Sequence, residues 1–151
     1  MKICSLFLIL IFIVSNSFAY ENIFASLHFN SDKEIVIWIK NNITYKSDME
    51  VHKIKDYWQT PNETITLRSG DCEDLAILFQ GFLVQTGKIG QLVFIKRTKG
   101  HAICIYKNKG RYKVFDNFKI ITIPKEYKNI DDIVTKYYKA KFINTIINIG
   151  I

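Results

Sequence analysis

The chain has 151 residues, a length typical of one domain, and 48% of them are hydrophobic, which excludes an intrinsically disordered protein. Its formal net charge of +7 comes from scattered basic residues, mostly lysine. A basic surface can favour an anionic partner, such as a cell envelope or an acidic protein, although this scatter is more typical of a lysine-rich composition. No RNA- or DNA-binding motif accompanies it, so we expect no nucleic-acid partner.

Residues 1–19 differ from the rest and are typical of a secretory signal peptide. Lys2 supplies a minimal basic start, and residues 3–14 are apolar apart from one serine. Ser17 and Ala19 are small residues at the spacing that signal cleavage requires. We therefore predict cleavage after Ala19 and export, either to the periplasm or into the medium.

Residues 20–151 are predicted to form one domain. They contain no stretch long and apolar enough to span a bilayer. The alternative for the start of the chain is that residues 1–19 are retained as an N-terminal membrane anchor.

Two short helices are predicted in the first third of the chain. Ser31 can cap a helix beginning at Asp32, and apolar residues follow at helical spacing, namely Ile35, Trp38, Ile39 and Ile43. Because residues 35–37 are all β-branched, a strand is the alternative for this segment. We predict a second helix at residues 49–58 and a loop at residues 59–70, which contain proline and glycine.

The clearest helix follows this loop. Asp71 is a good N-cap, and Asp74 stands three residues later, as in a capping box. An apolar stripe then repeats at spacings of three and four, through Leu75, Leu78, Phe79, Phe82 and Leu83. Gly87 supplies the left-handed stop. Cys72 therefore lies in the first turn, on the buried face.

The second half of the chain is predicted to form an antiparallel meander. Its strand candidates are residues 91–96, 101–106, 111–115 and 118–123. Asn129 can cap a last helix at residues 130–141. Helices followed by consecutive antiparallel strands indicate an α+β fold, with the cysteine-bearing helix packed on the sheet.

Cys72, His101 and Asp116 form the candidate catalytic set. A helix N-terminus offers unpaired N–H groups and positive potential, which favour a thiolate at Cys72. The acidic neighbours at positions 71, 73 and 74 oppose it. An imidazolium must therefore compensate for them, and His101 is the candidate.

The hairpin around Asn108-Lys109-Gly110 decides whether the histidine meets a carboxylate. A two-residue loop at Asn108-Lys109 places His101 opposite Asp116, and a three-residue loop with Gly110 in the left-handed conformation places it opposite Asn117. In the first register the carboxylate can accept from the ring, hold its tautomer and stabilise the imidazolium.

Cys104 is interpreted as a core residue. It stands three positions after His101, so strand alternation turns it to the opposite face of the sheet. We expect Cys72 and Cys104 to lie on different sides of the sheet, which argues against a disulfide and against a zinc site with His101.

These residues resemble the transglutaminase-like superfamily, and are most similar to the bacterial transglutaminase-like cysteine proteinases. The resemblance covers about residues 35–117 and rests on Tyr57-Trp58-Gln59-Thr60-Pro61-Asn62-Glu63-Thr64, Gly70-Asp71-Cys72-Glu73-Asp74 with Ala76, Gly87, His101-Ala102 and Asp116. It implies a papain-like fold with Cys72 as nucleophile, His101 as base and Asp116 as orienter. It also implies that Trp58 or Gln59 lies near the oxyanion, while a core position explains Trp58 equally well.

The resemblance further implies a possible calcium ion near the cysteine, because some proteinases of this group depend on calcium. Asp71 and Glu73 match the acidic positions concerned. Calcium takes about six to eight oxygen ligands, so a helix cap and a solvated first-turn acid are the alternative roles of these two residues. No other cofactor is expected.

The sequence thus predicts an exported cysteine-dependent acyl-transfer enzyme, foremost a peptidase acting on protein or peptide substrates, or else a transglutaminase or amidase. One alternative is a cell-wall peptidase of the other papain-like type. Another is a non-catalytic binding module that keeps the fold.

Overall fold

The computed structural model describes residues 22–96 and 98–146. The predicted signal peptide, residues 1–19, lies outside these residues. Within the described part, no helix combines the length and the apolar character needed to cross a bilayer.

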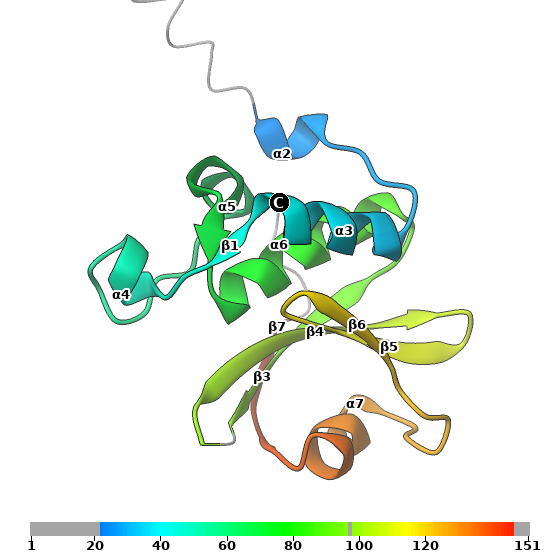
Figure 1. The fold of residues 1–151 in the computed structure, drawn as a ribbon. Helices are drawn as coiled ribbons and strands as arrows, with labels where there is room; N and C mark the ends of the chain where they lie inside the picture. Colours follow the sequence, from blue (N-terminus) through cyan, green and yellow to red (C-terminus); the bar gives the residue numbers. More distant parts are fainter. Residues whose placement is uncertain (1–21, 97, 147–151) are drawn as a thin grey trace, which may run out of the picture.

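The first half of the chain forms helices joined by short extended segments (Figure 1). These elements are α2 (Ile23–Ser26), α3 (Asp32–Asn42), β1 (Thr44–Tyr45), α4 (Asp48–Val51), α5 (Pro61–Leu67) and β2 (Ser69–Gly70). The Ser31 hydroxyl accepts from the Glu34 amide, so the predicted cap is confirmed and the strand alternative for this segment is wrong. The helix predicted at residues 49–58 is reduced to the single turn of α4.

The loop predicted at residues 59–70 was wrong, because this segment contains α5. Thr60 accepts from the Glu63 amide, Glu63 accepts from Thr60, and Pro61 stands in the first turn, where a missing N–H costs nothing. Thr60 and Glu63 have the spacing of a capping box, and a proline at this position begins a helix instead of breaking it.

Helix α6 (Cys72–Gln85) is the centre of the fold, and its predicted cap, stripe and left-handed Gly87 are confirmed. It packs on a five-stranded antiparallel sheet of order β6-β5-β4-β3-β7. The strands are β3 (Gly90–Lys96), β4 (Gly100–Asn108), β5 (Arg111–Asp116), β6 (Lys119–Thr122) and β7 (Lys141–Ile146). The α+β prediction is confirmed, whereas β7 was not foreseen.

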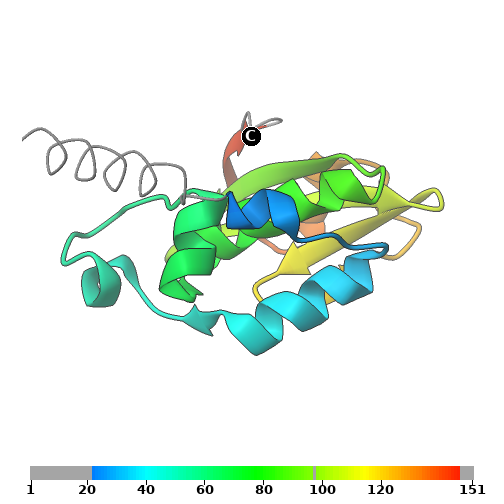
Figure 2. The same cartoon turned by 90° about the horizontal axis from the view of Figure 1, so that it is seen from above.

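The sheet is covered on both faces (Figures 1 and 2). On one face α2, α3 and α5 surround α6, and Leu92, Ala102, Cys104 and Phe115 face this layer. On the other face Val93, Ile103 and Val114 pack against a short helical segment. This segment is α7 (Ile130–Asp132) continued by the π-helix η1 (Ile133–Tyr137), which is shorter than the helix predicted at residues 130–141.

The β4–β5 hairpin differs from both predicted registers. Its two-residue turn is Lys109-Gly110, both with positive φ, and Asn108 pairs with Arg111. The paired residue numbers therefore add to 219, as for Cys104 and Phe115. Continued to the strand end, this register makes Asp116 a diagonal neighbour of His101 on the same face, rather than its direct partner.

Candidate active site

The turn before α6 is built around a buried aspartate. Asp74 is fully buried and accepts hydrogen bonds from the Asp71 amide at 3.1 Å and from the amide and side chain of Gln59 at 2.8 and 2.7 Å. Gly70 leaves room for it, since a Cβ there would lie 2.7 Å from the Asp74 Cβ. These contacts fix Cys72 as the first residue of the helix.

Cys72 and His101, from α6 and β4, line one cavity of about 330 Å³. Its other lining residues are Tyr45, Asp56, Trp58, Asp71, Glu73, Phe94, Gly100 and Ala102. The Ala102 backbone amide bonds to the Cys72 sulfur. The start of β4 therefore brings the histidine to the helix terminus that carries the thiol.

His101 and Asp116 form the pair expected from the sequence. The distance from His101 Nε2 to Asp116 Oδ1 is 2.7 Å, and Asp116 Oδ2 accepts a hydrogen bond from the Tyr138 hydroxyl at 3.1 Å. Burial favours the neutral acid, but the bonds from His101 and Tyr138 outweigh it and lower the pKa of Asp116. A charged carboxylate at Nε2 leaves Nδ1 as the ring atom available to act as a base.

Tyr138 is a site residue that the sequence did not indicate. It follows the π-helix η1, in which the Tyr138 amide bonds to the Ile133 carbonyl, five residues earlier. Only the tertiary fold brings this segment to the end of β5, so no local pattern could have identified it.

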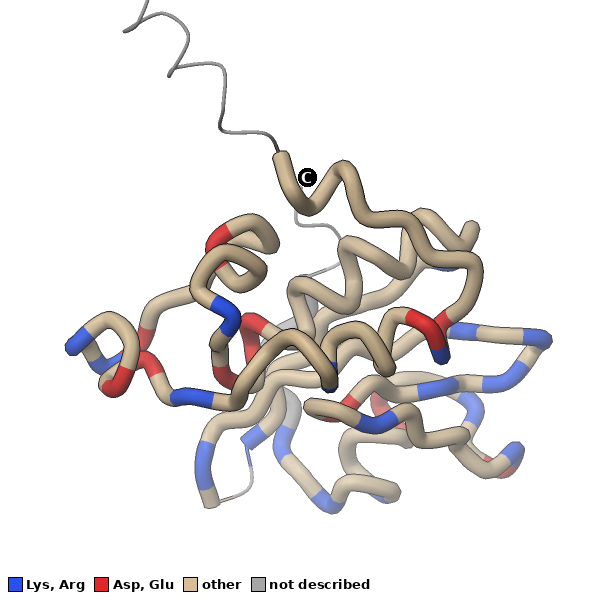
Figure 3. Tube along the Cα trace, turned by 45° about the horizontal axis from the view of Figure 1, so that its top comes forward, with Lys and Arg blue, Asp and Glu red and all other residues tan. Residues whose placement is uncertain are grey.

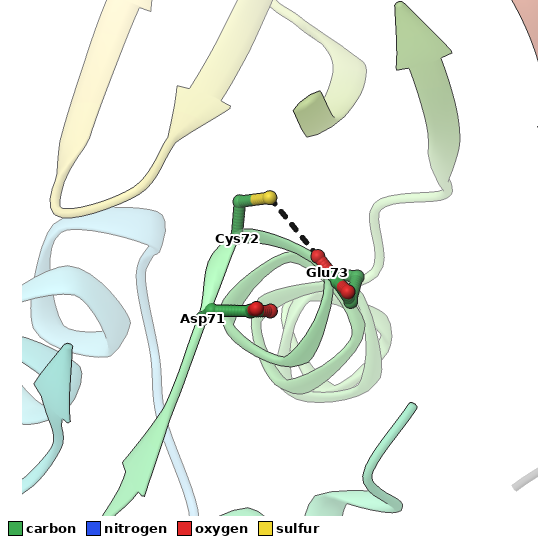
Figure 4. A group of neighbouring side chains, drawn as sticks. All are labelled: Asp71, Cys72 and Glu73. Atoms are coloured by element: carbon green, nitrogen blue, oxygen red, sulfur yellow. Dashed lines mark hydrogen bonds between the residues drawn. The ribbon is translucent and has the colours of Figure 1, made fainter. Parts of the chain in front are cut away.

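The thiol of Cys72 is held protonated (Figure 4). Its Sγ donates to Glu73 Oε2 at 3.0 Å. Burial, then the bond to Glu73 and its charge, raise the pKa of Cys72 to about 12, while the Ala102 amide acts in the opposite direction. The predicted opposition of the flanking acids to a thiolate is therefore present in the structure.

Five carboxylates gather beside the thiol. Their oxygens lie within 4.8 Å of one another in overlapping groups formed by Asp48, Asp56, Asp71, Glu73 and Asp74. Burial followed by Glu73 raises the pKa of Asp71, and burial raises that of Asp48. The sequence predicted Asp71 and Glu73 as possible calcium ligands, whereas Asp48, in α4, and Asp56, in the loop after it, were not predicted.

This acidic cluster has unused lone pairs. Asp48 is only 3% exposed, and neither its Oδ1 nor the buried Oδ1 of Asp71 has a partner among the described residues. Buried carboxylate oxygens without donors are suited to a hard divalent cation. The donor set of this chain therefore fits a calcium ion.

The two candidate oxyanion residues differ in position. Trp58 is 44% exposed, stacks on Phe94 with ring centroids 4.7 Å apart, and lines the cavity, so the core interpretation of this residue is wrong. Its indole N–H donates to Asp56 at 3.2 Å. Gln59 is buried, and its side-chain amide is held by Asp74 instead of lining the cavity.

Tyr45 was also missed by the sequence analysis. It lines the cavity from β1, where it pairs with Gly70, and its hydroxyl bonds to Cys72. Burial, followed by the charges of Cys72 and Asp71, raises its pKa. A two-residue strand leaves no periodicity by which it could be recognised.

The expected placement of Cys104 was wrong in one respect. Strand alternation does place Cys104 and Ile103 on opposite faces of the sheet. Helix α6, which carries Cys72, packs on the same face as Cys104, so both cysteines lie on one side of the sheet. Both are free thiols, and Cys104 is fully buried. None of the possible metal-binding groups among the described residues includes Cys104.

Comparison with known proteins gives a family and a fold. A family model described as a transglutaminase-like domain matches residues 18–149. Calcium-bound LapG of Legionella pneumophila is 19% identical with a TM-score of 0.56, over 83% of this chain and 70% of that chain. A second LapG structure from the same organism is 20% identical with a TM-score of 0.53, over 83% of this chain and 70% of that chain. The EGTA-treated form is 23% identical with a TM-score of 0.51, over 67% of this chain and 61% of that chain. At these identities the likeness shows the fold alone. No curated protein sequence matches the chain.

Proposed function

The chain belongs to the family of transglutaminase-like domains, as its motif predicted, and we propose that it is an exported cysteine-dependent acyl-transfer enzyme, foremost a peptidase. One observation carries the proposal. A cysteine at a helix N-terminus and a histidine bonded to an aspartate line the same cavity. Export rests on the sequence of residues 1–19.

The proposed reaction proceeds through a thioester. The Cys72 thiol gives its proton to Nδ1 of His101, and the sulfur attacks the carbonyl carbon of an amide. The Cys72 backbone N–H, at the helix terminus, stabilises the oxyanion. His101 then donates the proton to the leaving amine as the C–N bond breaks.

The same residues complete the cycle. His101 takes a proton from water as the water oxygen bonds to the thioester carbon. The C–S bond then breaks, a carboxylic acid is released, and the thiolate recovers the proton from His101. An amine in place of water gives transamidation. Asp116 keeps Nε2 protonated throughout and stabilises the imidazolium.

We further propose that the acidic cluster holds calcium. The buried unpartnered oxygens of Asp48 and Asp71 support this, and LapG, with the same fold, has calcium-bound and EGTA-treated structures. Asp48, Asp56, Asp71 and Glu73 are the residues that would hold the ion. When bound, it supplies positive charge that offsets the carboxylates beside the thiol.

Thiol labelling of the full chain tests the chemistry. We expect iodoacetamide to alkylate Cys72 faster than a model thiol in calcium and more slowly in EGTA, while buried Cys104 stays unmodified, as mapped by mass spectrometry. Cys72 reactivity no higher than that of the model thiol in either condition would favour the non-catalytic binding module.

A substrate panel tests the reaction. The wild-type chain should cleave members of a protein panel, and Cys72→Ala should lose this activity while keeping its circular dichroism spectrum. Cleavage of muropeptides alone would identify a cell-wall peptidase. Full activity of Cys72→Ala would refute the mechanism.

A further inference from the structure

A shallow basic cavity of about 820 Å³ lies next to the candidate active site, at the end of β3. Three lysines and two threonines dominate its lining, which consists of Lys96, Thr98, Thr135, Lys139, Ala140 and Lys141. No Asp or Glu belongs to this lining within the described part of the chain. Figure 3 shows basic positions around the β3–β4 turn, acidic positions at the start of α6, and positions of both signs around α4.

The lysines of this cavity lack acidic partners within the described part of the chain. Lys96 and Lys141 are direct partners in the β3–β7 ladder, and like charges opposite each other are destabilising. Lys139 has a φ of 49°, the left-handed conformation that ends η1, where the Ala140 amide bonds to the Val134 carbonyl. Among residues 22–96 and 98–146, none of these three lysines forms an ion pair, unlike Lys113 and Lys136. An anion bound between them would relieve the repulsion.

The cavity is held against the catalytic residues by the backbone. Lys96 is the direct cross-strand partner of Gly100, which lines the catalytic cavity, so one residue of each lining belongs to the same strand pair. Lys139 follows Tyr138, whose hydroxyl bonds to Asp116. The lysine cluster therefore borders the histidine side of the site, while Asp56, Asp71 and Glu73 line the cysteine side.

We propose that Lys96, Lys139 and Lys141 bind carboxylate side chains of the substrate, so that the site selects acidic peptides. This inference rests on the proposed peptidase function. Because the three lysines border only the histidine side of the site, an acidic substrate residue lies on one fixed side of the bond that is cut.

Cleavage of a peptide library made from a digested proteome tests the selection, with products mapped by mass spectrometry. We expect Asp and Glu to be enriched about fivefold at one position near the cut bond, the gain that a few exposed ion pairs provide. The double variant Lys96→Glu/Lys139→Glu should lose this enrichment. The matched control is Lys109→Glu/Lys125→Glu, which has the same change in net charge, also contains one positive-φ lysine, and lies in a separate basic cavity.

Binding separates this inference from the peptidase itself. In the Cys72→Ala background, fluorescence anisotropy should show tighter binding of an oligoglutamate peptide than of its oligoglutamine counterpart, and Lys96→Glu/Lys139→Glu should abolish the difference. Cleavage without acidic enrichment, or equal losses in both double variants, would overturn the inference and leave the enzyme proposal intact. If no peptide is cleaved, the enzyme proposal fails, and equal binding of the two peptides would overturn the inference as well.

Discussion

Replacing Tyr138 by Phe removes one hydroxyl and measures how firmly Asp116 is held. The hydroxyl donates to Asp116 Oδ2 at 3.1 Å, and the carboxylate is 22% exposed. A hydrogen bond to a charged group is worth roughly 1.5–3 kcal/mol, and partial exposure favours the lower end, about 1.5 kcal/mol. Since one pKa unit equals about 1.4 kcal/mol, the pKa of Asp116 should rise by about one unit.

The stability lost in Tyr138→Phe should depend on pH. The pKa of Asp116 is lowered in the folded protein, so its interactions add stability above its unfolded pKa, and this stability is lost as the pH falls. Tyr138→Phe should therefore lower the free energy of unfolding by about 1.5 kcal/mol at pH 7, and by less at about pH 3, which lies below the ordinary pKa of 3.8 for this carboxyl.

Urea unfolding followed by tryptophan fluorescence at the two pH values measures this difference. Tyr137→Phe is the matched control, because the neighbouring hydroxyl has no hydrogen bond among the described residues, and it should show little change at either pH. A loss of equal size at pH 7 and pH 3 in Tyr138→Phe would show that the ring packing matters and the hydrogen bond does not.

Other substitutions test the surroundings of the cysteine and the core. Glu73→Gln, measured in EGTA, should lower the pKa of Cys72 from about 12 by at least about one unit, read from the pH dependence of alkylation; an unchanged profile would contradict the role of the carboxylate. Gly70→Ala should cost about 2 kcal/mol or more in urea unfolding, because its methyl group would lie 2.7 Å from a buried aspartate, whereas Gly100→Ala, with no atom within 4 Å, should be close to neutral. Asp32→Asn should lower the free energy of unfolding by about 2 kcal/mol at pH 7, because three side chains donate to this carboxylate and hold its pKa at about 2 against burial. This loss of stability should fade as the pH approaches that value, and a loss independent of pH would refute the explanation.

Local chemistry made part of this structure predictable. The caps at Ser31 and Asp71 are formed by residues within three positions, so the starts of α3 and α6 could be deduced from the sequence. The turn of the β4–β5 hairpin was predicted one residue too early, which shifts the strand register by two residues. A shift of two leaves His101 and Asp116 on the same face, so the predicted contact between them still forms.

Tertiary placement set the limit of this prediction. The carboxylates of Asp48 and Asp56 reach the cysteine only after α4 folds back, and nothing in their local sequence marks them as neighbours of Glu73. Strand β7 joins the sheet beside β3, far away in the sequence, and its pairing depends on the turn after η1. The face of Cys104 was misjudged because alternation fixes relative faces, whereas packing decides which face α6 covers.

The two halves of the candidate site are prepared to different degrees. His101 is oriented by a carboxylate that two bonds hold, and the sheet fixes this arrangement. Cys72 is not ionised, because a pKa of about 12 leaves on the order of one thiolate in 10⁵ molecules at pH 7. The histidine is therefore oriented while the thiol is still neutral. A group that offsets the charge of Glu73 should therefore control the rate at which Cys72 reacts. Substitutions in the acidic cluster should change this rate far more than they change the free energy of unfolding.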